Sequence, residues 1–275
     1  MQDYLDREFT DTSIARVFDE LSFWSARFGM LLFDHIPIRP GLRVLDVGCA
    51  TGFPLFELAH TLGPSATLTG VDIWDAAIER AREKLTIYEL PNLEILRADA
   101  ANLPFPDASF DLIVSNLGIN NFDDPAAVIS ELRRVAAPGA DLALTTNVQG
   151  HMQRFYDAFR EVLQEAGDDD SLARLAANEC HRGTVASVRR LIEKGGFTVD
   201  HVVERSFTLR YGDGSALLRH SLTLIGFLPA WRKVVLPDRE KSTFDAIESR
   251  LNAIAANEGE LRMEVPMVYI QASRP

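Results

Sequence analysis

VLDVGCATGFPLFELA, residues Val44–Ala59, is the stretch that decides the fold. Its first residues form an apolar run typical of a buried strand, and its last residues carry apolar side chains at helical spacing. Gly48 and Gly52 lie between the two, where glycine permits a tight turn and lets a ligand approach the backbone closely. The stretch therefore predicts a strand, a ligand-binding turn and a helix.

Length and composition describe an ordinary globular protein. The chain has 275 residues, of which 47% are hydrophobic and 25% charged, with a net charge of −12. This acidic balance argues against a broad nucleic-acid or anionic-membrane surface, because phosphates would be repelled. The first residues lack a signal-peptide pattern, and the two cysteines lack metal-like spacing. We expect a cytoplasmic protein without a metal site, nucleic-acid partner or membrane insertion; its oligomeric state stays open, a homodimer being one possibility.

Strand and helix patterns alternate between residues 43 and 147. The strands are nearly continuous runs of Val, Ile and Leu, which indicates a parallel sheet covered on both faces. The pattern therefore predicts a doubly wound α/β fold. The expected strands are RVLDVG, TLTGVDI, LEILRAD, FDLIVSN and LALTTN, and the expected helices are PLFELAHTLG, AAIERAREKL and PAAVISELRRVAA, the last one stopped by Pro138-Gly139.

Helical segments interrupt this alternation. Two insertions, residues 148–183 and 212–262, look mostly helical, and a helical stretch also lies within residues 1–40. The strands TVDHVVERSFTLRY and VPMVYIQAS and the helix TVASVRRLIEKGGF complete the pattern. Since no Pro/Gly/Ser-rich linker appears, residues 1–275 are expected to form one domain. It would consist of an N-terminal lid (1–40), a binding core (41–147) and a cap made of the two insertions.

Acidic residues end the second and third expected strands. Ligands of open α/β sheets bind beyond the carboxyl ends of the strands, where the Gly48–Gly52 loop also lies. Asp72 is placed to accept hydrogen bonds from both hydroxyls of a ribose, and Asp99 to accept one from the amino group of adenine. Each feature has a structural alternative: a tight βα turn, an N-cap of the next helix for Asp72, and a capped turn for Asp99. Together they predict a nucleotide-type site.

A family resemblance covers roughly residues 43–147. Four stretches in this range resemble the class I S-adenosylmethionine-dependent methyltransferases, especially the branch of ubiquinone- and menaquinone-biosynthesis methyltransferases. They are VLDVGCATG, GVDI, RADAANLPFPDASFDLIVSN and ELRRVAAPGADLAL. The resemblance implies a Rossmann-like seven-stranded sheet whose last strand is antiparallel. It also implies methyl transfer from S-adenosyl-L-methionine to a small, partly apolar molecule, with S-adenosyl-L-homocysteine as product. A dinucleotide dehydrogenase would need a third glycine where Leu55 stands.

The resemblance also assigns cofactor contacts to one edge of the sheet. The first turn would lie along the methionine part, the ends of the second and third strands along ribose and adenine, and the end of the fourth along the methyl group. Ala50 stands where the fullest motif of the family has glycine. The implied set is Asp46 and Gly48 for methionine, Cys49, Ala50 and Gly52 in the turn, Asp72 for ribose, Ile73, Asp99 and Ala100 for adenine, and Asn116 and Leu117 beside the methyl group.

The acceptor side is expected beneath the lid and the cap, which the resembled topology places on the side of the cofactor. Trp24 and Tyr156 belong to an apolar and aromatic roof, although such residues also serve as the core of an insertion. Asn120 and Asn121 follow the fourth strand and are suited either to bind substrate or to shape the loop.

His151 is the first candidate for a base or an acceptor-orienting group, and His220 is the second. Helix capping or surface exposure is the alternative for each histidine. Two alternative functions also remain. RNA or protein methylation is disfavoured by the acidic charge, and a catalytically silent cofactor-binding protein is compatible with the same motifs.

Overall fold

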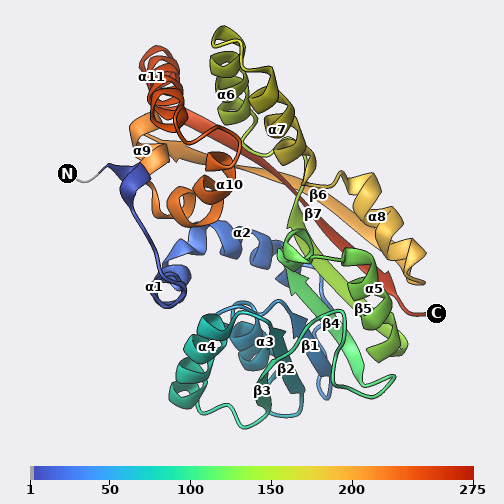
Figure 1. Cartoon of the computed structure of the whole chain (residues 1–275). Coiled ribbons are helices and arrows are strands. Elements are labelled where there is room, and N and C mark those ends of the chain that lie inside the picture. The colour runs from blue at the N-terminus through green and yellow to red at the C-terminus, as the bar shows by residue number, and fades with distance from the viewer. Residues whose placement is uncertain (1–2) are drawn as a thin grey trace. The chain divides into compact units, whose positions relative to one another are not determined.

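The computed structural model describes residues 3–275, without the side chains of Glu20 and Ser22. Seven strands form one mixed sheet in the order β3-β2-β1-β4-β5-β7-β6 (Figure 1). The strands are β1 (Arg43–Val47), β2 (Thr67–Asp72), β3 (Leu93–Arg97), β4 (Phe110–Asn116), β5 (Ala136–Asn147), β6 (Thr198–Tyr211) and β7 (Leu261–Ser273).

Strand direction confirms the predicted Rossmann-like sheet. β1 pairs in parallel with β2 and β4, β2 with β3, and β4 with β5. β7 runs against β5: the N–H of Gly139 donates to the carbonyl of Arg274, whereas the N–H of Val148, further along the chain, donates to the carbonyl of Pro266. The last strand is therefore antiparallel, as the resemblance implied.

The chain folds into two compact units. The sheet unit comprises Thr10–Thr146, Thr184–Glu204 and Met267–Pro275, and the helical unit comprises Met1–Phe9, Asn147–Gly183 and Arg205–Pro266. The sheet unit holds α1 (Asp11–Val17), the 3-10 turn η2 (Phe18–Leu21), α2 (Ser22–Phe33), α3 (Leu55–Leu62), α4 (Asp75–Tyr88), η3 (Gly118–Asn121), α5 (Pro125–Val135) and α8 (Val185–Lys194). The helical unit holds η1 (Tyr4–Asp6), α6 (Gln153–Glu165), α7 (Asp169–Cys180), α9 (Gly214–Arg219), the π-helix η4 (Thr223–Phe227), α10 (Leu228–Arg232) and α11 (Glu240–Glu258).

The core of the sheet unit follows from its apolar strands. Val44, Leu45 and Val47 of β1 are fully buried, because β1 lies between β2 and β4 with helices packed on the sheet. α3 and α4 pack against β2, and α4 also packs against β3. α5 begins as predicted at Pro125, where Asp124 caps the helix by accepting from the N–H groups of Ala126 and Ala127.

Two boundaries differ from the sequence-based expectation. α5 ends at Val135, and β5 begins at Ala136 and runs through Pro138-Gly139, so the prediction that the helix continues until this pair stops it was wrong. The reason is the long-range pairing with Arg274, directly after β7: the N–H of Gly139 donates to the carbonyl of Arg274, and the N–H of Arg274 donates to the carbonyl of Ala140. The N-terminal helical stretch is real but is interrupted by the 3-10 turn η2.

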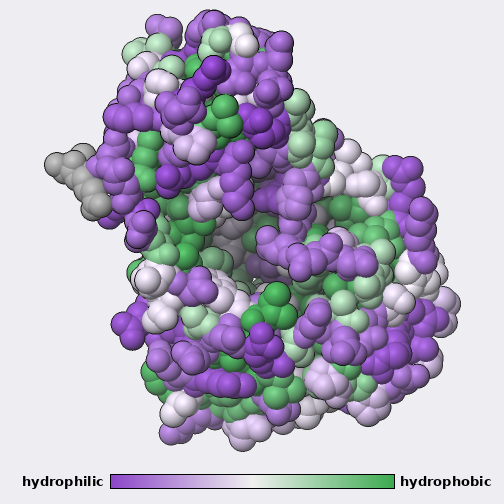
Figure 2. Space-filling view, in the orientation of Figure 1, coloured by the Kyte–Doolittle hydropathy of each residue, from purple (hydrophilic) through white to green (hydrophobic). Residues whose placement is uncertain are grey.

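The helices of the helical unit are amphipathic. Figure 2 shows mainly hydrophilic residues on the visible face of α6, α7 and α11. Phe155, Phe159 and Leu163 of α6 are almost completely buried on the opposite face. Within residues 3–275, no helix has the length and apolar character needed to cross a membrane.

Gly70 of β2 lies against the turn formed by residues Gly48–Gly52, called the glycine turn below, and its substitution tests that packing. A Cβ at this position would lie 2.3 Å from Cδ2 of Leu55 and 3.0 Å from Sγ of Cys49. We expect Gly70→Ala to lower the free energy of unfolding by about 1–3 kcal/mol, because overpacking displaces the turn. Gly212→Ala is the control, since nothing lies within 4 Å of its added Cβ. Equal stability of the two variants in urea unfolding would contradict this packing.

Candidate functional site

The turn after β1 depends on left-handed backbone conformations. Gly48, Ala50 and Gly52 have φ angles of +78°, +44° and +106°. A Cβ at Gly52 would also lie 2.0 Å from the ring of Phe56, so this position requires glycine for two reasons. Ala50 occupies a glycine-like conformation, which explains why the family's fullest motif has glycine there.

Asp72 fastens this turn to the end of β2. Its Oδ2 accepts a hydrogen bond from the N–H of Ala50 at 2.8 Å, and its Oδ1 accepts one from the N–H of Trp74 at 2.9 Å. Asp72 is therefore not the N-cap of α4, whose N-cap position is Trp74. Each carboxylate oxygen has acceptor capacity for a second hydrogen bond. The carboxylate can thus hold the turn and still accept two ligand hydroxyls.

Asp46 is the unusual group of the site. Its side chain is fully buried at the carboxyl half of β1, and neither oxygen has a hydrogen-bond partner of normal geometry within residues 3–275. Burial raises the pKa of Asp46 to about 8, and the negative charge of Asp72 adds to this, while the backbone N–H of Leu55 opposes it less strongly. An unpartnered buried carboxyl group is a suitable partner for a donor or cation on a ligand.

The next two positions lie on the edge formed by β2 and β3. Ile73 is 56% exposed, unusually open for an isoleucine that follows a buried strand. Asp99 is exposed, and its Oδ1 accepts a hydrogen bond from the N–H of Ala101 at 2.9 Å. The capped-turn alternative therefore describes one oxygen of Asp99, and the other oxygen remains suited to a ligand. Ala100 is buried.

The side chain of Asn116, at the end of β4, is held by the fold. Its Oδ1 accepts from Oγ1 of Thr145 at 2.7 Å, and its Nδ2 donates to the carbonyl of Ser25 at 3.2 Å. Leu117 has a φ angle of +71°, which is strained for a residue other than glycine and is typical of functional loops.

The two asparagines of η3 form hydrogen bonds to other residues of the sheet unit. Nδ2 of Asn120 donates to Oγ1 of Thr146 at 2.5 Å. Nδ2 of Asn121 donates to the carbonyl of Leu117 at 3.3 Å. Trp24 of α2 is partly exposed and packs on Phe28, with ring centroids 5.2 Å apart.

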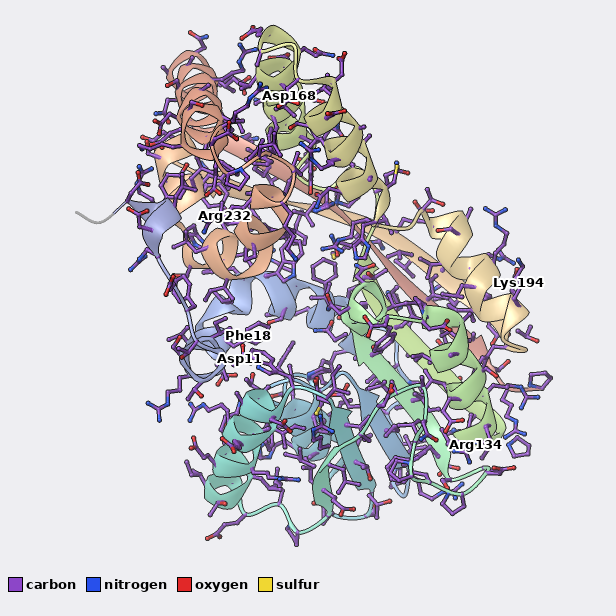
Figure 3. All side chains as sticks on the ribbon, in the orientation of Figure 1. Asp11, Phe18, Arg134, Asp168, Lys194 and Arg232 are labelled. Carbon is purple, nitrogen blue, oxygen red and sulfur yellow. The ribbon has the colours of Figure 1, made fainter. Side chains whose placement is uncertain are left out.

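Asp19 is a site residue that the sequence analysis missed. Its Oδ1 accepts from Oγ1 of Thr51 in the glycine turn at 2.7 Å and from Nζ of Lys84 in α4 at 2.9 Å. The neighbouring Phe18, labelled in Figure 3, contacts the ring of Trp74 edge-on at 5.5 Å. No local pattern marks Asp19, because its partners lie far away in the sequence.

The structure brings the eleven predicted cofactor residues and Trp24, Asn120 and Asn121 into the sheet unit, and it places His151, Tyr156 and His220 in the helical unit. Nδ1 of His220 accepts from the N–H of Leu222 at 3.2 Å, so this histidine serves a local turn. His151 is buried. Tyr156 donates its hydroxyl hydrogen to Asn178. Among the described residues, no three His, Cys, Asp or Glu side chains group as metal ligands would.

Comparison with known proteins shows that the chain is similar to methyltransferases. A family model described as a methyltransferase domain matches residues 38–204, more than half of the chain. A demethylmenaquinone methyltransferase from Listeria monocytogenes serotype 4a (strain HCC23) is 36% identical over 134 residues. That match covers 47% of this chain and 56% of the relative, so the chain spans only about half the length of this relative.

Solved structures share the fold at lower identity. A SAM-dependent methyltransferase from Aquifex aeolicus superimposes with a TM-score of 0.56 at 23% identity, over 71% of this chain and 93% of that one. The [4+2]-cyclase SpnF superimposes with a TM-score of 0.55 at 19% identity, over 90% of this chain and 80% of that one. At such identities the likeness concerns the fold alone, and the chemistry has to be argued from the site.

The buried carboxyl group of Asp46 predicts a pH dependence of stability in the ligand-free protein. An unfolded aspartate has a pKa of about 4, so between about pH 4 and about pH 8 only the folded state keeps this proton, and stability falls as the pH rises. The asparagine side chain of the Asp46→Asn variant carries no charge at any of these pH values. We expect its stability relative to the wild type to rise between about pH 5 and about pH 8 in urea unfolding.

Asp111→Asn is the matched control for this measurement. The guanidinium of Arg43 binds Asp111 and lowers the pKa of that carboxyl group, so the variant should lose stability similarly at both pH values. A stability difference between Asp46→Asn and the wild type that stays constant with pH would show that Asp46 is ionised in the folded state.

Proposed function

The chain belongs to the methyltransferase domain family, and from that premise we propose that it is an S-adenosyl-L-methionine-dependent methyltransferase acting on a small molecule. The observation that carries this proposal is Asp72, whose carboxylate holds the glycine turn and keeps acceptor capacity for both hydroxyls of a ribose. S-adenosyl-L-methionine brings an activated methyl group, so the protein has mainly to bind and orient the two reactants.

Other features of the sheet unit fit the remaining parts of this cofactor. The unpartnered carboxyl group of Asp46 suits the ammonium of the methionine part. The exposed side chain of Ile73 offers an apolar surface for the adenine ring, and the second oxygen of Asp99 suits its amino group. The turn would contact the methionine part through Gly48, Cys49, Ala50 and Gly52. Ala100 would lie beside the adenine, and Asn116 and Leu117 beside the methyl group.

The acceptor is proposed to be small and partly apolar. Relatives named demethylmenaquinone methyltransferases support this class. The net charge of −12 disfavours RNA as acceptor. A cofactor-binding protein without transfer activity remains the second candidate, since the [4+2]-cyclase likeness shows this fold in a protein named for other chemistry.

On the acceptor side, we assign His151 an orienting role. Burial, assisted by the positive charge of Arg182, lowers the pKa of His151 to about 3, which makes it a weak proton acceptor at neutral pH. The residues that we propose to contact the substrate are Trp24, Asn120, Asn121 and Tyr156. His220 is a weaker candidate because its Nδ1 is engaged in a turn.

Asp72→Ala tests cofactor binding. Loss of two hydrogen bonds to a charged acceptor, together with release of the Ala50 N–H, should weaken S-adenosyl-L-homocysteine binding about 100-fold in calorimetry. Asp111→Ala is the control, because it removes a carboxylate and its bond to Arg43 at the opposite end of the strands. Unchanged affinity in Asp72→Ala would contradict the assignment.

The same variants test transfer. Methyl-labelled S-adenosyl-L-methionine is supplied with a fractionated cell lysate, and label is expected in the small-molecule fraction for the wild type and Asp111→Ala, but not for Asp72→Ala. Label in RNA or protein would reject the small-molecule acceptor. Cofactor binding without any label would favour the protein without transfer activity.

A further inference from the structure

Two buried nitrogen atoms of the helical unit, Nε2 of His151 and Nε of Arg182, have no hydrogen-bond partner within residues 3–275. His151 is 3% exposed and lies in the turn between β5 and α6. Arg182 follows α7 and is half-buried. The N–H of Gln149 donates to the carbonyl of Gly183 at 3.0 Å, which holds the two segments side by side.

The turn that carries His151 is fixed by β7. The N–H of Val148 donates to the carbonyl of Pro266 at 3.2 Å, and the N–H of Met152 donates to the carbonyl of Glu264 at 2.7 Å. Met152 has a φ angle of +53°, a strained conformation for a residue other than glycine. Strain held in place by surrounding bonds is typical of ligand-binding segments.

Two aromatic rings lie next to the imidazole of His151. The ring of Tyr156 meets it edge-on at 5.6 Å, and the ring of Phe227 lies 6.1 Å away. The hydroxyl of Tyr156 is already engaged, since it donates to Asn178 and accepts from Nε1 of Trp231. Within residues 3–275, Nε2 of His151 therefore takes no hydrogen bond from the neighbouring Tyr156 hydroxyl and keeps no partner.

Arg182 carries an uncompensated charge. It forms no ion pair and no guanidinium hydrogen bond in the described part of the chain, and its burial lowers the pKa of the guanidinium. Arg160 of the same unit shows the contrast: its guanidinium binds Glu179 at 2.7 Å and Asp157 at 2.7 Å. Burying an unpaired cation is unfavourable, so a structural role alone does not account for Arg182.

We propose that Arg182 and His151 form a binding site for a small anionic group, either a carboxylate or a phosphate. The planar guanidinium matches the oxygen pairs of both groups, and Nε2–H of a neutral imidazole donates a further hydrogen bond. The site uses residues of the helical unit only and does not require methyl transfer.

Binding of simple anions tests the site directly. The full chain, free of cofactor, is titrated with benzoate and with inorganic phosphate, by calorimetry and by following the His151 ring in ¹⁵N-labelled protein. We expect saturable binding that Arg182→Gln weakens by at least about tenfold. Arg190→Gln is the control and should bind as the wild type, because Arg190 is exposed and its guanidinium donates to the carbonyl of Ala186 in its own helix.

Tighter binding of benzoate than of phosphate would identify the ligand group as a carboxylate, and tighter binding of phosphate would identify it as a phosphate. Absence of saturable binding of both probes, or equal affinity in Arg182→Gln and the wild type, would overturn the proposal.

Thermal unfolding separates binding from a structural role. Without anion, Arg182→Gln should unfold at the same temperature as the wild type or a few degrees higher, since an unpaired buried charge is removed. A lower unfolding temperature would assign Arg182 to the scaffold and overturn the proposal. Failure of the wild type to bind S-adenosyl-L-homocysteine would reject the proposed function and leave the anion site intact.

Discussion

The carboxylate of Asp72 joins the ends of two neighbouring strands, and the site depends on this link. One oxygen holds the N–H of Ala50 in the glycine turn, and the other holds the N–H of Trp74 before α4. The left-handed conformation of Ala50 is unfavourable for alanine, so the turn needs this external support. Asp19 adds a second link through Thr51, which connects the N-terminal segment to the same turn.

Several residues at the proposed ligand-binding positions of each unit lower the stability of the fold. Within residues 3–275, Asp46 is buried without a hydrogen bond of normal geometry, Leu117 is strained, and Arg182 is a half-buried cation without an acidic partner. Elsewhere the same fold pairs its arginines with carboxylates, as Arg160 and Arg250 show. Such local violations are expected where a protein keeps groups available for a ligand, with the core supplying the compensating stability.

The sheet and its turn could be predicted from sequence because local patterns encode them. Strands buried on both faces appear as apolar runs, and Asp72 follows its strand directly. Contacts between distant segments leave no such pattern. The strand through Pro138-Gly139 depends on β7, the link of Asp19 to Lys84 depends on how α1, η2 and α4 pack, and the approach of Arg182 to His151 depends on a bond across more than thirty residues. These features required the three-dimensional structure.

A crystal structure of the full chain with S-adenosyl-L-homocysteine tests the central claim most directly. Our account predicts that both ribose hydroxyls bind Asp72, that the adenine packs on Ile73 beside Asp99, and that the amino group of the homocysteine part lies toward Asp46. A ligand bound elsewhere, or bound in this turn with its ribose away from Asp72, would contradict the account.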